Sequence, residues 1–373
     1  MNKKVFAAIA TLTGTIIGAG FLGIPYVSWK AGFPIAFVYI VVLGLLMYLS
    51  RLYWGEVILR TKGNHELVGY AEKYLGKKGK YVIMFAMIFG IYSSLLAYMI
   101  GEGRSLSFLF FGSTEHTLLF GIIFWFVLSG LTHSGIKAMK RFEPIALIVV
   151  LITFSVIFLY YAPSVDIAKL ATISGDKLDW FVPFGVILFS FLGTAALPEV
   201  GMLLRGKEKY MKKVITISSL LPIIIYLLFA LVVTGSFAQV PEVATLALGK
   251  VFVFLGILTM FTAFLVLSFA IRDMFWYDLN LSKFKSWLLA SLTPMVLFVL
   301  LTVFKLLTFT RILGLAGAVG GGIEVIAVMF MLKKAREKGN REPEFTVHMS
   351  WVVIVLITLV FTLGIFYELL RFF

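Results

Sequence analysis

The residues with the clearest chemical potential form a glycine-rich interruption of the first apolar run, between Gly14 and Pro25. Each glycine in a helix interior costs roughly 1 kcal/mol relative to alanine, and proline removes a backbone donor. At membrane depth, unpaired backbone is tolerated only where protein covers it or where it lines a wet cavity. The stretch predicts a discontinuous helix whose free amides bind an anion and whose free carbonyls bind a cation. The alternative is that Gly14 and Gly18, four residues apart, only allow close helix packing.

A second interruption lies between Phe189 and Glu199, in the sixth apolar run. It places a glycine, two hydroxyls, a proline and a carboxyl within one membrane-length segment. An ordinary proline kink is the alternative, but the matching interruption in the first run favours a pair of broken helices. Because five is odd, two five-span halves have opposite orientations in the membrane. The pattern therefore predicts an inverted-repeat transporter with its site between the breaks.

The composition is typical of a polytopic membrane protein. The 373 residues are 61% hydrophobic and 14% charged, with a mean hydropathy of +1.01. A helix needs roughly 20 apolar residues to cross a hydrocarbon core about 30 Å thick, and eleven runs satisfy this. We expect the spans at 5–27, 33–59, 81–111, 117–136, 142–162, 180–203, 214–237, 247–277, 287–304, 309–332 and 350–372.

Basic residues concentrate in the connections on one side of these spans. With the N-terminus placed in the cytoplasm, the inner segments hold 25 of the 33 Lys and Arg residues. Among those counted as inner are Arg51, Lys137, Lys140 and Arg141. This bias predicts a multi-pass protein of the plasma or inner membrane with an inside N-terminus and an outside C-terminus.

The net charge of +14 therefore indicates contact with anionic lipid, and no nucleic-acid partner is expected. The chain has no cysteine, and its four histidines are scattered, so neither a disulfide framework nor a metal cluster is predicted. Of the inner connections, 64–76 has apolar residues at helical spacing, which predicts a short amphipathic helix at the inner surface. The connection 333–343 is polar and basic, and we expect it to be solvated and without a chemical role.

Three stretches resemble the amino acid/auxin permease family, particularly its bacterial aromatic amino acid permeases. The residues from Gly14 to Pro25 are similar to the first-span signature G-T-x-I-G-A-G-M-L-A-L-P. The residues from Leu95 to Leu106 resemble the third-span L-L-x-A-Y-x-x-G-G-G-x-x-L. The residues from Phe189 to Val200 resemble the sixth-span T-S-F-G-F-H-G-N-V-P-S-L. Span number and orientation also fit, so the resemblance covers essentially the whole chain.

The chain departs from these patterns at three positions. Leu192 and Thr194 replace the sixth-span glycine and histidine, and Glu102 replaces a third-span glycine. Leucine fills volume that glycine leaves open, so the resemblance supports an amino acid in general and leaves its side chain open.

The resemblance implies the LeuT-type fold of the APC superfamily. This is an all-α membrane fold of 11 transmembrane helices, with two inverted five-helix repeats, discontinuous helices 1 and 6, and here an eleventh helix. The expected divisions are 1–162 for the first repeat, 163–332 for the second, and 333–373 for the cytoplasmic linker and the eleventh helix.

The resemblance also implies a substrate site between the two breaks. The amides of Gly18, Ala19 and Gly20, with Thr15 nearby, would receive the substrate carboxylate, as expected for a half-helix N-terminus. The carbonyls around Phe189, Ser190 and Gly193 would hold the ammonium. Ser94, Tyr98, Phe191 and Phe261 would face the substrate side chain, although aromatic residues in membrane spans also serve as simple packing.

Two coupling ions remain open. In sodium-coupled relatives of this fold, carbonyls of helix 1 and two adjacent hydroxyls of helix 8 bind sodium, which implies Gly14, Ile17 and Thr262 here. The second hydroxyl is absent, because the next residue is Ala263. Thr259 or a water could replace it. Alternatively, Thr262 bonds to its own backbone.

A proton is the other candidate. It needs a carboxyl in low dielectric, where burial favours the neutral acid. Glu324, about two turns inside span ten and beside glycines, is the first candidate, and Glu102 is the second. Glu56 and Glu199 follow, but they lie near the inner surface, where Arg51 and Arg205 are close enough in sequence to pair with them.

We therefore expect a secondary active transporter that imports a neutral, apolar or aromatic amino acid by ion-coupled symport and alternating access. Its partners would be the amino acid and the lipid bilayer, with Na⁺ or H⁺ as coupling ion and no cofactor. The alternative is an amino-acid receptor or sensor on the same fold without net transport. An enzyme is not expected, because no nucleophile and base or metal cluster lies at one depth. A phosphate loop of the form G-x-x-x-x-G-K-[ST] is also absent.

Overall fold

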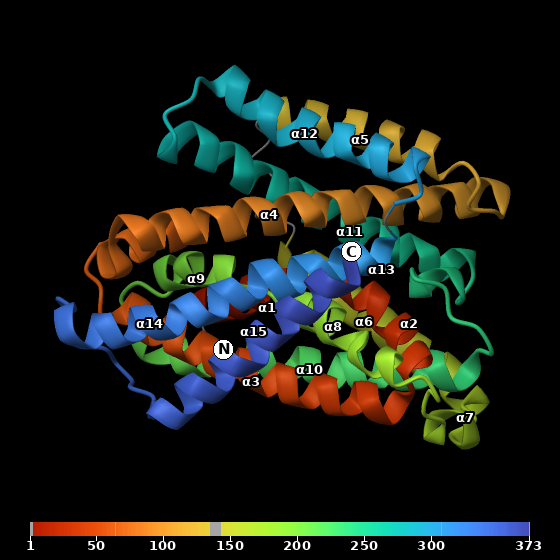
Figure 1. Cartoon of the computed structure of the whole chain (residues 1–373), viewed down its shortest axis with the longest axis horizontal. Coiled ribbons are helices and arrows are strands. Elements are labelled where there is room, and N and C mark those ends of the chain that lie inside the picture. The colour runs from red at the N-terminus through yellow and green to blue at the C-terminus, as the bar shows by residue number, and fades with distance from the viewer. Residues whose placement is uncertain (1–2, 64, 135–142, 307, 373) are drawn as a thin grey trace.

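The computed structural model describes residues 3–63, 65–134, 143–306 and 308–372. Within these residues all regular elements are helical, and 11 segments are long and apolar enough to cross a membrane. The predicted number of spans is thereby confirmed. The spanning helices run side by side along the longest axis, with α5 and α12 together at one edge and α3 and α10 at the other (Figure 1).

Seven of the spans contain a single principal helix. These are α3 (Phe33–Leu59), α4 (Leu67–Phe111), α5 (Thr117–Ser134), α6 (Glu143–Tyr161), α10 (Met211–Ser236), α12 (Lys283–Val303) and α15 (Trp351–Phe372). Span eight is α11 (Lys250–Asp273) followed by the π-helical turn Met274–Asp278. Span ten consists of α13 (Phe309–Leu315), the π-helical stretch Ala316–Gly321 and α14 (Gly322–Lys338).

Spans one and six are both broken, as predicted. In span one, α1 (Lys3–Ile16) ends before the break, and the 3₁₀ turn Gly20–Gly23 leads into α2 (Ile24–Ala31). In span six, α8 (Pro183–Ser190) and α9 (Leu197–Leu203) flank the 3₁₀ turn Thr194–Ala196. The inverted symmetry of two repeats and the three divisions of the chain remain predictions.

Two glycines let the broken spans touch. A Cβ on Gly20 would lie 2.7 Å from Phe189 Cδ1 and 2.8 Å from Ser190 Cα. A Cβ on Gly193 would lie 2.7 Å from Ile16 Cγ1. Any larger residue at either position would force the two breaks apart, so these glycines fix the geometry of the centre.

The amphipathic helix expected at 64–76 is present as the first part of α4, while residue 64 lies outside the described residues. The helix bends at Gly76, where φ is 75°, a left-handed conformation that glycine adopts readily. Its apolar face is buried in the protein, with the Tyr70 ring centroid 4.8 Å from that of Trp54 in α3. This helix therefore covers α3 with the face that was expected to rest on the membrane surface.

The connection after span ten is largely exposed, as expected, but it also contacts the end of α3. That it has no chemical role stays a prediction. Asn340 N donates to Arg60 O at 3.0 Å, and Arg341 Nη1 donates to Leu59 O at 3.1 Å. Hydropathy alone did not reveal these contacts, because they join polar groups at the end of α3 to a segment far away in sequence.

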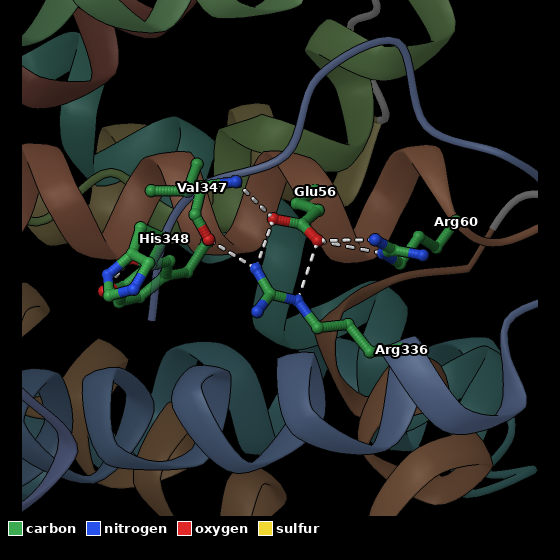
Figure 2. Close-up of polar contacts among 6 residues, drawn as sticks. Glu56, Arg60, Arg336, Val347 and His348 are labelled. Carbon is green, nitrogen blue, oxygen red and sulfur yellow. Dashed lines mark hydrogen bonds and ion pairs between the residues drawn. The ribbon is translucent and has the colours of Figure 1, made fainter. Parts of the chain in front are cut away.

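The same connection completes a cluster around the fully buried Glu56 (Figure 2). The carboxylate accepts hydrogen bonds from Arg60 Nε at 2.9 Å, from Arg336 Nε and Nη2, each at 2.9 Å, and from Val347 N at 2.8 Å. Glu56 thus pairs with Arg60 and Arg336, and its expected pairing with Arg51 is wrong. Charge-assisted bonds of this kind join α3, α14 and the connection into one unit.

Arg51 itself lies within α3 and is only 1% exposed. It therefore does not belong to a connecting loop and adds nothing to the charge bias that we used for orientation. Lys137, Lys140 and Arg141 lie outside the described residues.

Candidate functional site

A cavity of about 240 Å³ lies where the two breaks meet. Its walls come from the break of span one, the break of span six, and the neighbouring parts of α4, α6, α11 and span ten. Lining residues such as Thr11, Met87, Leu147, Ala270 and Glu324 belong to the halves of their spans nearer the end at which α1 begins. We call this end of the bundle the N-terminal face, and the cavity extends from the breaks toward it.

Most residues that the sequence singled out line this cavity. Of the substrate candidates, Thr15, Gly18, Gly20, Ser94, Tyr98, Phe189 and Gly193 lie in its wall, while Ala19, Ser190, Phe191 and Phe261 do not. The four sodium candidates Gly14, Ile17, Thr259 and Thr262 all line it. Of the proton candidates, Glu324 lines the cavity and Glu102 does not.

The break of span one leaves amides without partners. The last helical bond runs from Ile17 N to Thr13 O at 2.8 Å. In the described part of the chain, the amides of Gly18, Ala19 and Gly20 then have no acceptor. The Tyr98 hydroxyl lies 3.9 Å from the point where a Cβ on Gly18 would sit. These donors form a cradle suited to a carboxylate.

The hydroxyls that line the cavity offer hydrogen-bond acceptors, whereas the amides offer donors. Thr15 Oγ1 donates to Thr11 O at 2.8 Å, Ser94 Oγ to Gly90 O at 2.6 Å, and Thr262 Oγ1 to Leu258 O at 3.1 Å. Each hydroxyl thus donates its one hydrogen to a carbonyl of its own helix. For Thr262, this confirms the alternative that its side chain bonds to its own backbone. What remains toward the cavity is lone pairs, which accept from an ammonium or coordinate a cation.

Sequence reasoning missed three side chains that cover the carbonyls of the breaks. Arg51 Nη2 donates to Phe191 O, and Trp54 Nε1 donates to Thr194 O at 3.0 Å. The Tyr226 hydroxyl lies 2.8 Å from Ile16 O and 2.9 Å from Ser190 O. A signal did exist for Arg51, since an arginine inside the predicted span 33–59 marks a functional position by default. Trp54 and Tyr226 are indistinguishable from ordinary packing residues in the sequence.

Glu324 connects span ten to the break of span six, because the Thr194 side chain forms a hydrogen bond with its carboxyl. Glycines bring the surrounding segments close, as a Cβ on Gly320 would lie 3.1 Å from Gly90 Cα. Glu102, in contrast, is fully buried outside the cavity. Neither of its carboxyl oxygens has a hydrogen-bond partner among the described residues.

A polar cluster closes the opposite end of the bundle. Glu242, in the connection between α10 and α11, accepts from Arg104 Nη1 at 2.5 Å and from Thr310 Oγ1 at 2.7 Å. Burial alone would raise the pKa of the Glu242 carboxyl, but the Arg104 charge and hydrogen bonds from Thr308, Thr310 and Arg104 together lower this pKa. The carboxylate therefore ties α4 and α13 together at this end of the bundle whenever it is ionised.

Known proteins similar to this chain are mostly amino acid transporters. The chain is 28% identical over 243 residues to Tyrosine-specific transport system 1 of Haemophilus influenzae, which covers 64% of this chain and 59% of that protein. It is 24% identical over 241 residues to Low affinity tryptophan permease of Proteus vulgaris, covering 60% and 56%. It is also 27% identical over 254 residues to Spore germination protein A2 of Bacillus subtilis, covering 66% and 67%. The chain thus spans less than two thirds of the length of the tyrosine-specific transport system and of the tryptophan permease.

The model of the Tryptophan/tyrosine permease family matches residues 1–247, which include both breaks and the three stretches that carry the resemblance. Members of this family are membrane permeases, not enzymes, and the eleven apolar spans of this chain agree with that. The chain belongs to the tryptophan/tyrosine permease family.

Proposed function

We propose that this protein is a secondary active transporter that imports a neutral amino acid by ion-coupled symport. The observation that carries the proposal is the polarity of the cavity, whose wall includes Gly18 and Gly20 with free amides and Thr15, Ser94 and Thr262 with hydroxyl lone pairs. Such a site offers donors to a carboxylate and acceptors to an ammonium, which are the two charged ends of an amino acid. Because two relatives are named for tyrosine and tryptophan transport, an aromatic amino acid is the first substrate to test.

The N-terminal face is proposed to be cytoplasmic, in a plasma or inner membrane. The loop charges support this orientation even without Arg51. The cavity then opens toward the cytoplasm, and the cluster of Arg104, Glu242 and Thr310 closes the outer side. Alternating access requires this cluster to separate when the cavity opens outward.

We consider two alternative coupling ions, with a proton as the first candidate and sodium as the second. A proton on Glu324 is favoured by the contact with Thr194, which joins that carboxyl directly to a break. Sodium is the second candidate, bound by the carbonyls of Gly14 and Ile17 with oxygens of Thr259 and Thr262 in the same cavity wall. The missing hydroxyl at Ala263 weakens this second arrangement.

Uptake into proteoliposomes tests the proposal. Labelled tyrosine, tryptophan, phenylalanine, leucine and glutamine are supplied under an inward sodium gradient, an inward proton gradient, or neither. Accumulation under one gradient identifies both the substrate and the ion. Glu324→Gln in the same vesicles then separates the two ions, because it should abolish proton-driven accumulation and leave sodium-driven accumulation intact.

The alternative is a receptor that binds an amino acid without net transport. The observation that supports this receptor alternative is the similarity to a protein named for spore germination. Saturable tyrosine binding by the purified protein, with no accumulation or exchange under any gradient, would support the receptor and refute the transporter.

A further inference from the structure

Arg51 is a buried cation whose charge no described carboxylate balances. Its side chain is 1% exposed, and no described carboxylate lies within ion-pair distance. The guanidinium stays protonated in proteins, and taking an ion out of water costs several kcal/mol unless other groups compensate it. Something other than a salt bridge must therefore stabilise the charge.

The compensating groups that Arg51 contacts are the end of α8 and a hydroxyl of α10. Arg51 Nη2 donates to Phe191 O, the residue that directly follows α8, and Nη1 donates to Ser219 Oγ at 3.0 Å. The C-terminus of a helix carries a partial charge equivalent to roughly −0.5 elementary charge. The end of α8 is thus a site that attracts a cation, and the guanidinium occupies it.

The end of α1 meets the same point. The Tyr226 hydroxyl bridges Ile16 O and Ser190 O, the last residues of α1 and α8, at 2.8 and 2.9 Å. The Tyr226 ring centroid lies 5.0 Å from that of Phe191, whose carbonyl binds Arg51. Two negative helix ends therefore converge beside one fixed positive charge.

Arg51 also supports the cavity wall without lining it. A Cβ on Gly193 would lie 2.7 Å from Ile16 Cγ1 and 3.8 Å from Arg51 Nε. Gly193 lines the cavity, and Arg51 Nε has no acceptor in the described chain. The guanidinium thus lies directly behind the turn 191–193 that forms part of the substrate site.

We propose that Arg51 is a built-in cation. It fills the position at the converging ends of α1 and α8 that would otherwise attract a small bound cation, and it positions the turn 191–193 for substrate. Arg51 is a positioning residue, since it does not touch the cavity. The part of this inference that concerns substrate rests on the proposed function, whereas the part that concerns the bound cation does not.

The test compares two variants that remove the charge of Arg51, one that leaves the volume of its side chain empty and one that fills it. R51A removes the guanidinium and leaves room for a free cation, whereas R51M removes the charge and fills the room. The thermal unfolding midpoint of each full-length protein in detergent is followed by tryptophan fluorescence in millimolar guanidinium chloride. Choline chloride at equal ionic strength is the control. We expect guanidinium to raise the midpoint of R51A and to leave the wild-type and R51M midpoints unchanged.

Binding of labelled tyrosine provides the functional arm. We expect R51A and R51M to lose about tenfold or more in affinity, and only R51A to recover with guanidinium. S219A, which removes one acceptor but keeps the charge, should lose less than either variant.

Two results would overturn the inference. One is an R51A midpoint that does not respond to guanidinium, sodium or potassium. The other is an R51M variant with wild-type tyrosine affinity. If R51A does not fold, R51K must unfold at a higher temperature than R51M, and equal midpoints would refute the role of the charge. If the wild type does not bind tyrosine but R51A responds to guanidinium, the proposed substrate fails and the built-in cation stands.

Discussion

Replacing Gly18 by leucine should block the substrate site while leaving the fold intact. Gly18 lines the cavity and carries one of the free amides. Its φ lies outside the left-handed region that side chains avoid, so the backbone accepts a side chain. The nearest atoms to a Cβ at Gly18 would be Thr15 O at 3.5 Å and Tyr98 Oη at 3.9 Å, which is ordinary contact. The added side chain therefore grows into the cavity and not into the protein.

The expected magnitude follows from the volume and the hydrogen bonds. A leucine side chain has four carbon groups, each close to the roughly 30 Å³ that one water occupies in the liquid, or about 120 Å³ together. That is half of the cavity's 240 Å³. A carboxylate displaced from two of the amides loses about 1.5 kcal/mol for each charge-assisted bond, so affinity should fall by at least about a hundredfold.

The assay compares three glycine variants by binding of labelled tyrosine and by thermal unfolding. Gly18→Leu should lose binding and keep an unfolding midpoint close to wild type. Gly18→Ala, which fits the available space, should keep most of both. Gly20→Ala should lower the midpoint, because its Cβ would overlap Phe189 and Ser190 at 2.7–2.9 Å.

Wild-type tyrosine affinity in Gly18→Leu would refute the reasoning. It would show that the amides do not receive the substrate. The alternative interpretation of the sequence, in which Gly14 and Gly18 only allow close helix packing, would then be favoured. A midpoint lowered as far as that of Gly20→Ala would instead mean that the space above Gly18 is not free.

Three further predictions concern the charged groups. Glu324→Gln should reduce proton-driven uptake at least about tenfold and remove the pH dependence of uptake; unchanged proton-driven uptake and pH profile would make Glu324 structural. Because the pKa of Glu242 is lowered in the folded protein, its stabilising contribution is full above the ordinary carboxyl pKa and is lost as the pH falls through the lowered value. The wild-type unfolding midpoint should therefore fall only below about pH 4, and E242Q should remove that acid-dependent part; a wild-type loss between pH 5 and 7 that E242Q abolishes would contradict this. Glu56→Ala should cost about 3 kcal/mol of unfolding free energy, because it strands two arginines around a buried site. Glu344→Ala, which breaks a partly exposed pair with Arg341, should cost less than about 1 kcal/mol, and equal losses would show that the Glu56 cluster is not special.

The number of spans and both breaks could be predicted because they depend on local properties. Membrane-length apolar runs and helix-breaking residues act within one segment, wherever it packs. Span boundaries were less accurate where polar residues continue a helix. Span three was expected from residue 81, but its helix already begins after the bend at Gly76, and span ten was expected to end at 332 but continues to Lys338. Hydropathy does not distinguish a polar helical turn from a loop.

The site was predictable in outline for the same reason. Glycines and hydroxyls at the breaks mark the cavity, but the residues that complete it depend on which helices meet there. Phe261 is placed outside the cavity because the lining residues of α11 include Thr259, Thr262, Ala263 and Val266, which follow helical spacing on another face. Arg51 and Tyr226 reach the breaks from helices whose packing no local pattern reveals.

The two kinds of backbone group at the breaks differ in a way that would orient an amino acid bound in the cavity. The carbonyls expected to hold an ammonium already accept hydrogen bonds: Phe189 O from Leu192 N, Ser190 O from Tyr226, Phe191 O from Arg51, and Gly193 O from Ala196 N. The amides of Gly18 to Gly20, in contrast, donate to no backbone acceptor in the described chain. An unsatisfied buried donor is costly, so these amides favour binding of an anion. The ammonium is then expected near the lone pairs of Ser94 and Thr262, so the amino acid would lie across the cavity from span one toward α4 and α11.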